Sequence, residues 1–446
     1  MHPEMNKYSE LVYKYNQIDT DLYNKFNVKR GLRNADGSGV LVGLTAIGEV
    51  HGYIMDEGER SPVEGRLRYR GIDVNDIVDG CQKDGRLGFE ETIYLLLFGT
   101  LPKENELKKF SLLLGEKRIL PENFTENMIL SNPSANIMNK LARSVLVSYS
   151  YDEEAENRSI SNVLRQCIEM IARFPVFAAY GYQAKRHYYH GDSLFLHHPE
   201  KDLSTAENFL RMIRPDMQYT KLEAELLDLS LILHAEHGGG NNSAFSIHVI
   251  TSSDTDAYSA VAAGVGSLKG AKHGGANIKV MGMMENIKEN VKDWSNEKEL
   301  SEYLAKIIQK EAFDKRGLIY GFGHAVYTLS DPRAVILRAR ASALAEEKGR
   351  TDEFNLYCLM EKIVPQVFSD IKKSTKIIAP NVDFFSGFVY SMLNIPEELY
   401  TPLFAISRIS GWSAHLIEEM LNGGRIIRPA YKHVHRSREY TPIKKR

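Results

Sequence analysis

The residue types best suited to moving protons gather in residues 231–284, which hold four of the chain's 14 histidines. Two of these, His237 and His273, stand directly before glycines, where the backbone can turn sharply and a small ligand can approach closely. A histidine at such a break is more often placed for chemistry than one in the middle of a helix. The other two, His234 and His248, are expected to have supporting or structural roles.

Another histidine, His324, follows two glycines that flank an aromatic residue, in the segment Gly321-Phe322-Gly323. This pattern predicts a loop whose backbone N–H and C=O groups are accessible to a ligand. A plain tight turn is the competing interpretation, and composition alone does not choose between the two.

Asp383 precedes an apolar run, FFSGFVYSML, that predicts a buried helix. An aspartate at such a position usually caps the helix, and this structural role is one interpretation. A carboxylate beside Phe384 and Phe385 would instead have its pKa raised towards that of a useful general base. Both interpretations stay open at this level.

Arg408 lies on a predicted helix whose facing neighbours include Phe404 and Trp412, so its surroundings are largely apolar. A guanidinium in such surroundings needs a carboxylate, which either the protein or a ligand must supply. An internal salt bridge and a ligand-binding role are the two alternatives.

Histidines, one candidate base and several arginines together favour proton transfer on a substrate that carries several carboxylates. No G-x-S-x-G segment or cysteine–histidine pair offers a nucleophile. His234 and His237 could be metal ligands at i and i+3, but no cysteine or carboxylate cluster completes a coordination set. A metal-dependent hydrolase and a non-catalytic helical binding protein are therefore the weaker alternatives, and we expect no metal.

The composition excludes several classes of protein. Lys+Arg 56 against Asp+Glu 58 gives the 446-residue chain a formal charge of -2, so no global field favours nucleic acid or an anionic membrane. The three cysteines are far apart in the sequence, which fits a reducing compartment. No apolar run approaches the ~18 residues that span a bilayer. We expect a soluble, cytoplasmic protein without a membrane partner.

The pattern of elements predicts an all-α protein with a little β-structure near its N-terminus. Residues 1–30 are expected to form a helical arm, and residues 31–77 small hairpins and turns, with β-type runs at 40–42, 49–53 and 66–70. From Phe89 onward the chain reads almost wholly as helix, including one Ala/Gly-rich helix that should pack closely. Predicted helix starts are the capping box Ser204-x-x-Glu207, Asp331-Pro332 and Thr401-Pro402, and residues 221–234 should end at three glycines.

Five sequence blocks, in order and with matching spacing, resemble the citrate synthase family. The blocks are HAEHGGGNNSAF, SLKGAKHGGAN, GFGHAVYTLSDPR, NVDFFSG and the SRISGWSAHLIEE…RIIRP tail, across roughly residues 40–430. The resemblance implies a two-domain helical fold. Residues 1–274 and 392–446 would form the large domain, and residues 275–391 a small mobile domain that closes over the substrates.

The resemblance also implies a role for each matching residue. Asp383 would remove a methyl proton from acetyl-CoA, and His273 would donate a hydrogen bond to the thioester oxygen. His324 would hydrogen-bond and protonate the ketone oxygen of oxaloacetate. The oxaloacetate carboxylates would be held by His237, Arg333 and Arg408, and by Arg428 from the second subunit of a homodimer.

The expected reaction is the Claisen-type condensation of the tricarboxylic acid cycle, in which citryl-CoA is hydrolysed to citrate and CoA. No cofactor is expected, because the CoA thioester is itself a substrate. Relatives often carry a basic residue for a CoA phosphate where this chain has Thr328. The CoA contacts are therefore expected from Gly321, Phe322, Gly323, Lys269 and Lys272. A 2-methylcitrate synthase that uses propionyl-CoA through the same residues is the alternative within the family.

Overall fold

The computed structural model describes residues 3–34, 38–56, 59–373 and 377–445, in two compact units. The first unit, residues 1–44, contains α1 (Pro3–Asn16), α2 (Asp21–Lys25) and a 3-10 turn, η1 (Arg30–Leu32). The predicted helical arm is therefore confirmed. The β-run predicted at 40–42 is wrong, because those residues pair with no strand among the described residues, and only Gly39 forms an isolated bridge, with Arg33.

A small antiparallel sheet opens the second unit, residues 45–446. It consists of β1 (Gly48–Asp56), β2 (Glu59–Tyr69) and β3 (Ile72–Asp73) in that order, with Gly48 paired to Tyr69. This confirms the predicted hairpin over 49–53 and 66–70. The hydroxyl of the buried Tyr69 donates to the carbonyl of Ile232 at 2.8 Å, so the hairpin is hydrogen-bonded to the end of a helix that carries site residues.

The rest of this unit is helical, as the sequence predicted. The α-helices are α3 (Val74–Lys83), α4 (Phe89–Phe98), α5 (Glu104–Lys117), α6 (Ile137–Ser148), α7 (Ile160–Lys185), α8 (Thr205–Ile213), α9 (Lys221–His234), α10 (Asn242–Thr251), α11 (Ala257–Leu268), α12 (Ala276–Asn290), α13 (Glu297–Ile308), α14 (Pro332–Glu347), α15 (Thr351–Lys372), α16 (Val382–Met392) and α17 (Tyr400–Asn422). Among the described residues, no helix has both the length and the apolarity needed to cross a bilayer.

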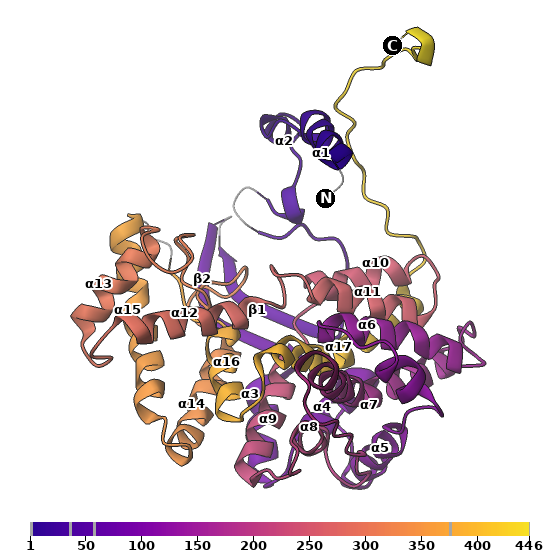
Figure 1. Ribbon diagram of the computed structural model, residues 1–446, viewed down its shortest axis with the longest axis vertical. Coiled ribbons are helices and arrows are strands. Elements are labelled where there is room, and N and C mark those ends of the chain that lie inside the picture. Colours follow the sequence, from indigo (N-terminus) through magenta and orange to yellow (C-terminus); the bar gives the residue numbers. More distant parts are fainter. Residues whose placement is uncertain (1–2, 35–37, 57–58, 374–376, 446) are drawn as a thin grey trace. The chain divides into compact units, whose positions relative to one another are not determined.

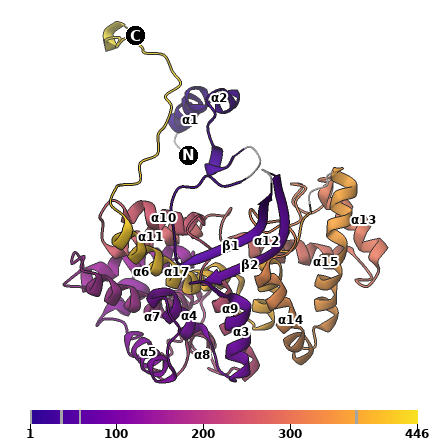
Figure 2. The same cartoon turned by 180° about the vertical axis from the view of Figure 1, so that it is seen from behind.

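Helices α12 to α15 gather on one side of this unit, and α5 to α7, α10 and α11 on the other, in both views (Figures 1 and 2). Between them lie α9, α16 and α17. Helix α17 is buried from Tyr400 to Leu416, which makes it the central element of the core. Residues that α9, α16 and α17 carry are therefore held by packing on several sides.

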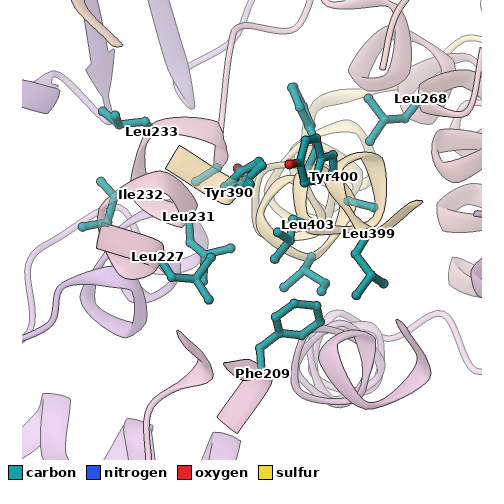
Figure 3. Packing of buried hydrophobic residues seen from close by; sticks show 14 of the residues in the cluster. Phe209, Leu227, Leu231, Ile232, Leu233, Leu268, Tyr390, Leu399, Tyr400 and Leu403 are labelled. Atoms are coloured by element: carbon teal, nitrogen blue, oxygen red, sulfur yellow. The ribbon is translucent and has the colours of Figure 1, made fainter. Parts of the chain in front are cut away.

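Apolar side chains from α8, α9, α16 and α17 meet around this centre (Figure 3). The rings of Tyr390 and Tyr400 lie 5.2 Å apart, and Leu403 and Leu231 are buried nearby. The hydroxyl of Ser407 also donates to the carbonyl of Leu231. These contacts fix α17 against α9, and Arg408 beside the end of α9.

Most predicted helix boundaries are confirmed by their capping contacts. Ser204 and Glu207 form the expected capping box, α9 covers the predicted 221–234, and Asp331 caps α14 with Pro332 in its first turn. The predicted cap at Thr401 is wrong, because α17 begins one residue earlier. The Thr401 hydroxyl instead donates to the carbonyl of Gly274 at 2.9 Å, which connects α17 to the turn after His273.

The close packing predicted for the Ala/Gly-rich helix is confirmed in α11. A Cβ added at Gly264 would lie 2.9 Å from Ile247 and 3.2 Å from the ring of Trp412. The indole N–H of Trp412 donates to the Ser243 hydroxyl at 3.0 Å, and Ser243 also contacts His273. The absence of a side chain at Gly264 thus lets α10, α11 and α17 approach one another around that histidine.

Candidate active site

His237 lies three residues beyond the end of α9, in a buried position. Its ring is 5.0 Å from that of His324 and 5.5 Å from that of Tyr327, and its Nε2 has no hydrogen-bond partner in the described part of the chain. Burial, and then the nearby positive charge of Arg333, hold the pKa of His237 well below its usual value. The ring is therefore neutral, with one nitrogen left for a ligand.

His324 has its tautomer set by the backbone of its own loop. Its Nδ1 accepts hydrogen bonds from the N–H groups of Val326 at 3.0 Å and Tyr327 at 3.2 Å. Since Nδ1 supplies a lone pair, the neutral ring carries its proton on Nε2 and acts there as a donor. The ring also stacks on Tyr327, with centroids 4.7 Å apart. A donor with this fixed orientation suits a carbonyl oxygen that gains negative charge.

The glycine loop is hydrogen-bonded to the segment that precedes Asp383. The Asn381 N–H donates to the Gly321 carbonyl at 2.8 Å, and the Asn381 side chain donates to the Gly323 carbonyl at 3.0 Å. The ring of Phe322 packs on that of Phe384 at 4.8 Å. His324 and Asp383 therefore lie on two segments that hydrogen bonds and ring packing join directly.

Replacing Gly321 by alanine should impair both folding stability and kcat. Gly321 has φ +80°, and an added Cβ would lie 2.9 Å from Phe384 and from Val280. The backbone strain costs about 1–2 kcal/mol and the overpacking a further ~1–3 kcal/mol. Gly323→Ala is the matched control, because Gly323 has φ +85° but nothing within 4 Å. Denaturation midpoints and kcat should fall further for Gly321→Ala, and equal effects would contradict the packing argument.

Asp383 is the second residue of α16 and is not its cap. Asn381 caps the helix, and its side-chain oxygen accepts the Asp383 N–H at 3.0 Å. The capping interpretation of Asp383 is therefore wrong, and its carboxylate is left for another task. Burial raises the pKa of Asp383 to about 6, although the nearby Arg333 guanidinium acts in the opposite direction. A carboxylate with such a pKa is a competent base near neutral pH.

Arg333 is buried in the first turn of α14 and forms a bidentate ion pair with Asp331, at 3.0 and 2.7 Å. Asp331 also accepts the N–H of Val382 at 3.3 Å. The ion pair with Asp331 raises the pKa of Arg333 above its usual value, so the guanidinium is permanently charged. One aspartate thus connects the start of α14 to the start of α16, and holds Arg333 close to Asp383.

Arg408 is fully buried on α17 and forms no ion pair with any residue that the structure describes. Its Nε donates to the carbonyl of His234 at 2.7 Å, and its guanidinium lies 4.7 Å from the ring of Phe404. The two terminal nitrogens have no partner among the described residues. The internal salt bridge considered above is therefore not formed. A buried guanidinium whose terminal N–H groups lack partners in this part of the chain can accommodate an anion, and a carboxylate has the geometry for a bidentate contact.

His273 lies in the turn after α11, with its Nε2 3.1 Å from the Ser243 hydroxyl. Burial, and then the positive charge of Arg408, lower the pKa of His273 to about 4, so the ring is neutral at physiological pH. Lys269 and Lys272 lie in the same turn and are exposed. The turn therefore combines a neutral imidazole with two exposed cations.

The structure connects most of the predicted site residues through contacts or mutual electrostatic effects. Arg428 is an exception, since it is exposed on the irregular segment after α17, and so are the exposed Lys269 and Lys272. Three residues to which the sequence analysis gave no role in the site support it, namely Tyr327, Asp331 and Asn381. Each lies within three residues of a residue already singled out, but its role depends on contacts between distant segments. Sequence spacing gave no signal for those contacts.

Comparison with known proteins identifies the family. The family model described as the citrate synthase C-terminal domain matches residues 36–430. The citrate synthase of Haloferax volcanii is 33% identical over 406 residues, covering 89% of this chain and 98% of that protein. The 2-methylcitrate synthase 1 of Corynebacterium glutamicum is 31% identical over 428 residues, covering 94% and 98%. The chain belongs to the citrate synthase family.

Solved structures of the family agree with this assignment. A citrate synthase from Thermoplasma acidophilum, determined as a ternary complex with carboxymethyl coenzyme A and oxaloacetate, has a TM-score of 0.75 and 27% identity. The alignment covers 94% of this chain and 99% of that one. The Thermotoga maritima citrate synthase gives a TM-score of 0.72 at 29% identity, over 94% and 99%. The all-α fold and the resemblance described above are confirmed, and the chain is an acyltransferase.

Proposed function

We propose that the protein condenses the acetyl group of acetyl-CoA with oxaloacetate and then hydrolyses citryl-CoA, which releases citrate and CoA. The observation that carries this proposal is the pair of unsatisfied guanidinium nitrogens of the buried Arg408. The charges of Arg408 and Arg333 both affect the pKa of Asp383 and that of the neutral His237, so these four residues lie close enough to interact. A dicarboxylate bound there would lie beside a base of suitable pKa.

The first chemical step is removal of a methyl proton from acetyl-CoA by Asp383. A thioester α-proton is weakly acidic, so the forming enolate needs a donor already in place. His273 supplies that donor as a neutral imidazole, because its lowered pKa keeps it from carrying a positive charge. The proton moves to the Asp383 carboxylate while the thioester oxygen receives the hydrogen bond of His273.

The second step forms the carbon–carbon bond at the ketone carbon of oxaloacetate. Nε2–H of His324 is the donor that hydrogen-bonds the ketone oxygen and transfers its proton as charge develops there. His237, Arg333 and Arg408 hold the substrate carboxylates. Water then attacks the thioester of citryl-CoA, and the C–S bond breaks to release CoA.

Propionyl-CoA is the alternative acyl donor, since the related enzyme from Corynebacterium glutamicum is named a 2-methylcitrate synthase. One extra methylene is worth only about 1–3 kcal/mol of discrimination in a hydrophobic pocket. A steady-state comparison of kcat/KM for acetyl-CoA and propionyl-CoA, each with saturating oxaloacetate, tests the assignment. We expect acetyl-CoA to give the higher value, and a clear preference for propionyl-CoA would make the protein a 2-methylcitrate synthase.

The pH dependence of kcat/KM should report Asp383. The base acts only when ionised, and its pKa is raised to about 6, so kcat/KM should rise about tenfold per unit below pH 6 and level off above it. His273 does not contribute in this range, because its pKa is lowered to about 4. A profile measured from pH 5 to 8 that stays flat below pH 7 would contradict Asp383 as the base.

Two features of the assembly belong to the same proposal. Residues 275–391 form the small mobile domain, whose closure over residues 1–274 and 392–446 excludes water during condensation. The protein is a homodimer in which Arg428 reaches the partner's active site. The contribution of Arg428 to the partner's site is supported by its exposed position on an irregular segment.

Mixed dimers test this sharing of Arg428. When Arg428→Ala and Asp383→Ala subunits are combined, one of the two sites in a heterodimer regains a complete residue set. Activity should therefore reappear on mixing two inactive homodimers, measured as release of free CoA. No recovery in verified heterodimers would contradict the contribution in trans.

The CoA contacts are proposed to come from the loop Gly321–Gly323 and from two exposed lysines, Lys269 and Lys272. Both lysines lie in the turn of His273, where the thioester oxygen would be bound. Thr328 stands where relatives often have a cation for a CoA phosphate, which leaves that task to the lysines. Acetyl-CoA and oxaloacetate are the substrates, no cofactor is required, and we assign the enzyme to the cytoplasm.

A further inference from the structure

A cluster of two histidines and three carboxylates lies behind the oxaloacetate-binding residues and has no role in the mechanism above. His248 comes from α10, His415 and Glu418 come from α17, and one ligand atom of each lies within 4.8 Å of the others. Glu419 and Glu236 complete the cluster from its two sides. These residues bring three separate segments of the chain together.

In each histidine, the ring nitrogen that points away from the other histidine, here called the outer nitrogen, is hydrogen-bonded to a carboxylate. Nδ1 of His248 lies 2.8 Å from Glu419, and Nε2 of His415 lies 3.0 Å from Glu236. Since an ionised carboxylate only accepts hydrogen bonds, both outer nitrogens must carry protons. This arrangement, in which a carboxylate fixes the tautomer of each histidine, is the usual outer shell of a metal-ligating imidazole.

The other two nitrogens, His248 Nε2 and His415 Nδ1, face each other inside the cluster. His248 Nε2 and His415 Nδ1 are 3.1 Å apart, and Glu418 Oε2 lies 3.6 Å from the latter nitrogen. At this distance the two nitrogens share either a proton, as a hydrogen bond, or a bound cation that replaces that proton. Ligand atoms on a tetrahedral zinc ion are about 3.3 Å apart, given Zn–N bonds of about 2.0–2.1 Å. Two of the three spacings, 3.1 and 3.6 Å, are close to that value, and all three atoms lie within 4.8 Å of one another.

The carboxylate of Glu418 has a fixed orientation and one oxygen that no hydrogen bond to the described residues occupies. Its Oε1 accepts the N–H of Ala46 at 2.7 Å, which fixes the orientation of the group. Its Oε2 is buried and makes no hydrogen bond to the described residues. The His248 side chain is 13% exposed, which leaves an edge of the cluster open for a metal to enter.

We infer that His248, His415 and Glu418 form a binding site for a zinc-class divalent cation, with Glu419 and Glu236 as its outer shell. Two imidazoles and one carboxylate favour zinc over magnesium or calcium, which prefer sites made of oxygen ligands. The bound ion would connect α10 to α17 and, through Glu236, to the segment that carries His237. Its role is structural, outside the substrate site.

Equilibrium dialysis of the full-length protein against zinc chloride, followed by metal analysis, tests this inference. All samples carry the substitutions His433→Gln and His435→Gln, because these two tail histidines have rings 5.7 Å apart and could bind metal adventitiously. We expect one zinc per chain in this background. His248→Gln should weaken binding at least about 100-fold, and Glu419→Gln should keep the stoichiometry with about 10- to 100-fold weaker binding.

Cobalt substitution reads the ligands directly and does not depend on activity. The background protein should give the visible absorption of tetrahedral cobalt, and His248→Gln should not. Thermal unfolding of the metal-free variants checks that each one folds. If His248→Gln does not fold, Glu418→Gln replaces it as the ligand variant. No zinc bound by the background protein, undiminished binding in both ligand variants, or equally tight binding of magnesium would each overturn the inference.

Discussion

Asp383→Ala should lower kcat by about 10²- to 10⁴-fold, the usual contribution of a positioned general base. The KM for oxaloacetate should change little, because the arginines that hold that substrate are untouched. The structure supports a large effect, since burial raises the pKa of Asp383 to about 6 and the cap of α16 is Asn381 rather than Asp383. Steady-state kinetics with both substrates, together with an oxaloacetate binding isotherm, measure the two quantities separately.

Asp383→Asn is the matched control for this prediction. The amide keeps the size of the side chain but has no basicity, so kcat should fall as far as in Asp383→Ala. If the asparagine variant retained most of the wild-type kcat, the carboxylate would be structural and another group would have to be the base.

Arg408→Ala should raise the KM and the dissociation constant for oxaloacetate by about 30-fold to a few thousand-fold. Truncating one partner of a buried, hydrogen-bonded charge pair costs about 2–5 kcal/mol, and each 1.4 kcal/mol is tenfold. The substitution should lower the folding stability of the substrate-free protein by less than it lowers the binding free energy of oxaloacetate. The reason is that the two terminal nitrogens of Arg408 have no partner among the described residues. Isothermal titration with oxaloacetate measures the loss, and circular dichroism checks the fold.

Arg408→Lys separates charge from geometry. A lysine keeps the positive charge but cannot make the bidentate contact, so it should recover only part of the affinity. Full recovery would mean that Arg408 acts as a simple point charge. The assignment of roles to Asp383 and Arg408 would fail altogether if their phenotypes were exchanged, with oxaloacetate binding lost in the first variant and only kcat lost in the second.

The sequence predicted local structure well wherever one segment carries its own signal. The limits of α9, the capping box at Ser204 and the cap of α14 at Asp331 follow from side chains that bond to their own helix. Thr401 failed as a cap because α17 already begins at Tyr400, and the Thr401 hydroxyl donates instead to the distant carbonyl of Gly274. The strand predicted at 40–42 failed because a strand also needs a partner, which the local pattern cannot supply.

For the candidate site, too, the sequence predicted what depends on residue type and local sequence, and did not predict contacts between distant segments. Family resemblance and residue types pointed to Asp383, His273, His324 and Arg408, and their neighbours in the sequence already indicated burial or a sharp turn. The sequence left open whether Asp383 caps α16 and whether Arg408 has an internal partner. Those questions concern hydrogen bonds across the fold, and the answers came from Asn381 in the first case and from two unpaired nitrogens in the second.

By itself, the sequence determined an all-α chain of the citrate synthase type and named the residues that carry its chemistry, because periodicity, caps and ordered motifs are properties of the local chain. Only the tertiary structure decided the electrostatics. The lowered pKa of His273, the raised pKa of Asp383 and the tautomer of His324 depend on burial and on contacts with particular neighbouring groups. The cluster of His248, His415 and Glu418 is likewise visible only after folding, since α10 and α17 are far apart in the chain.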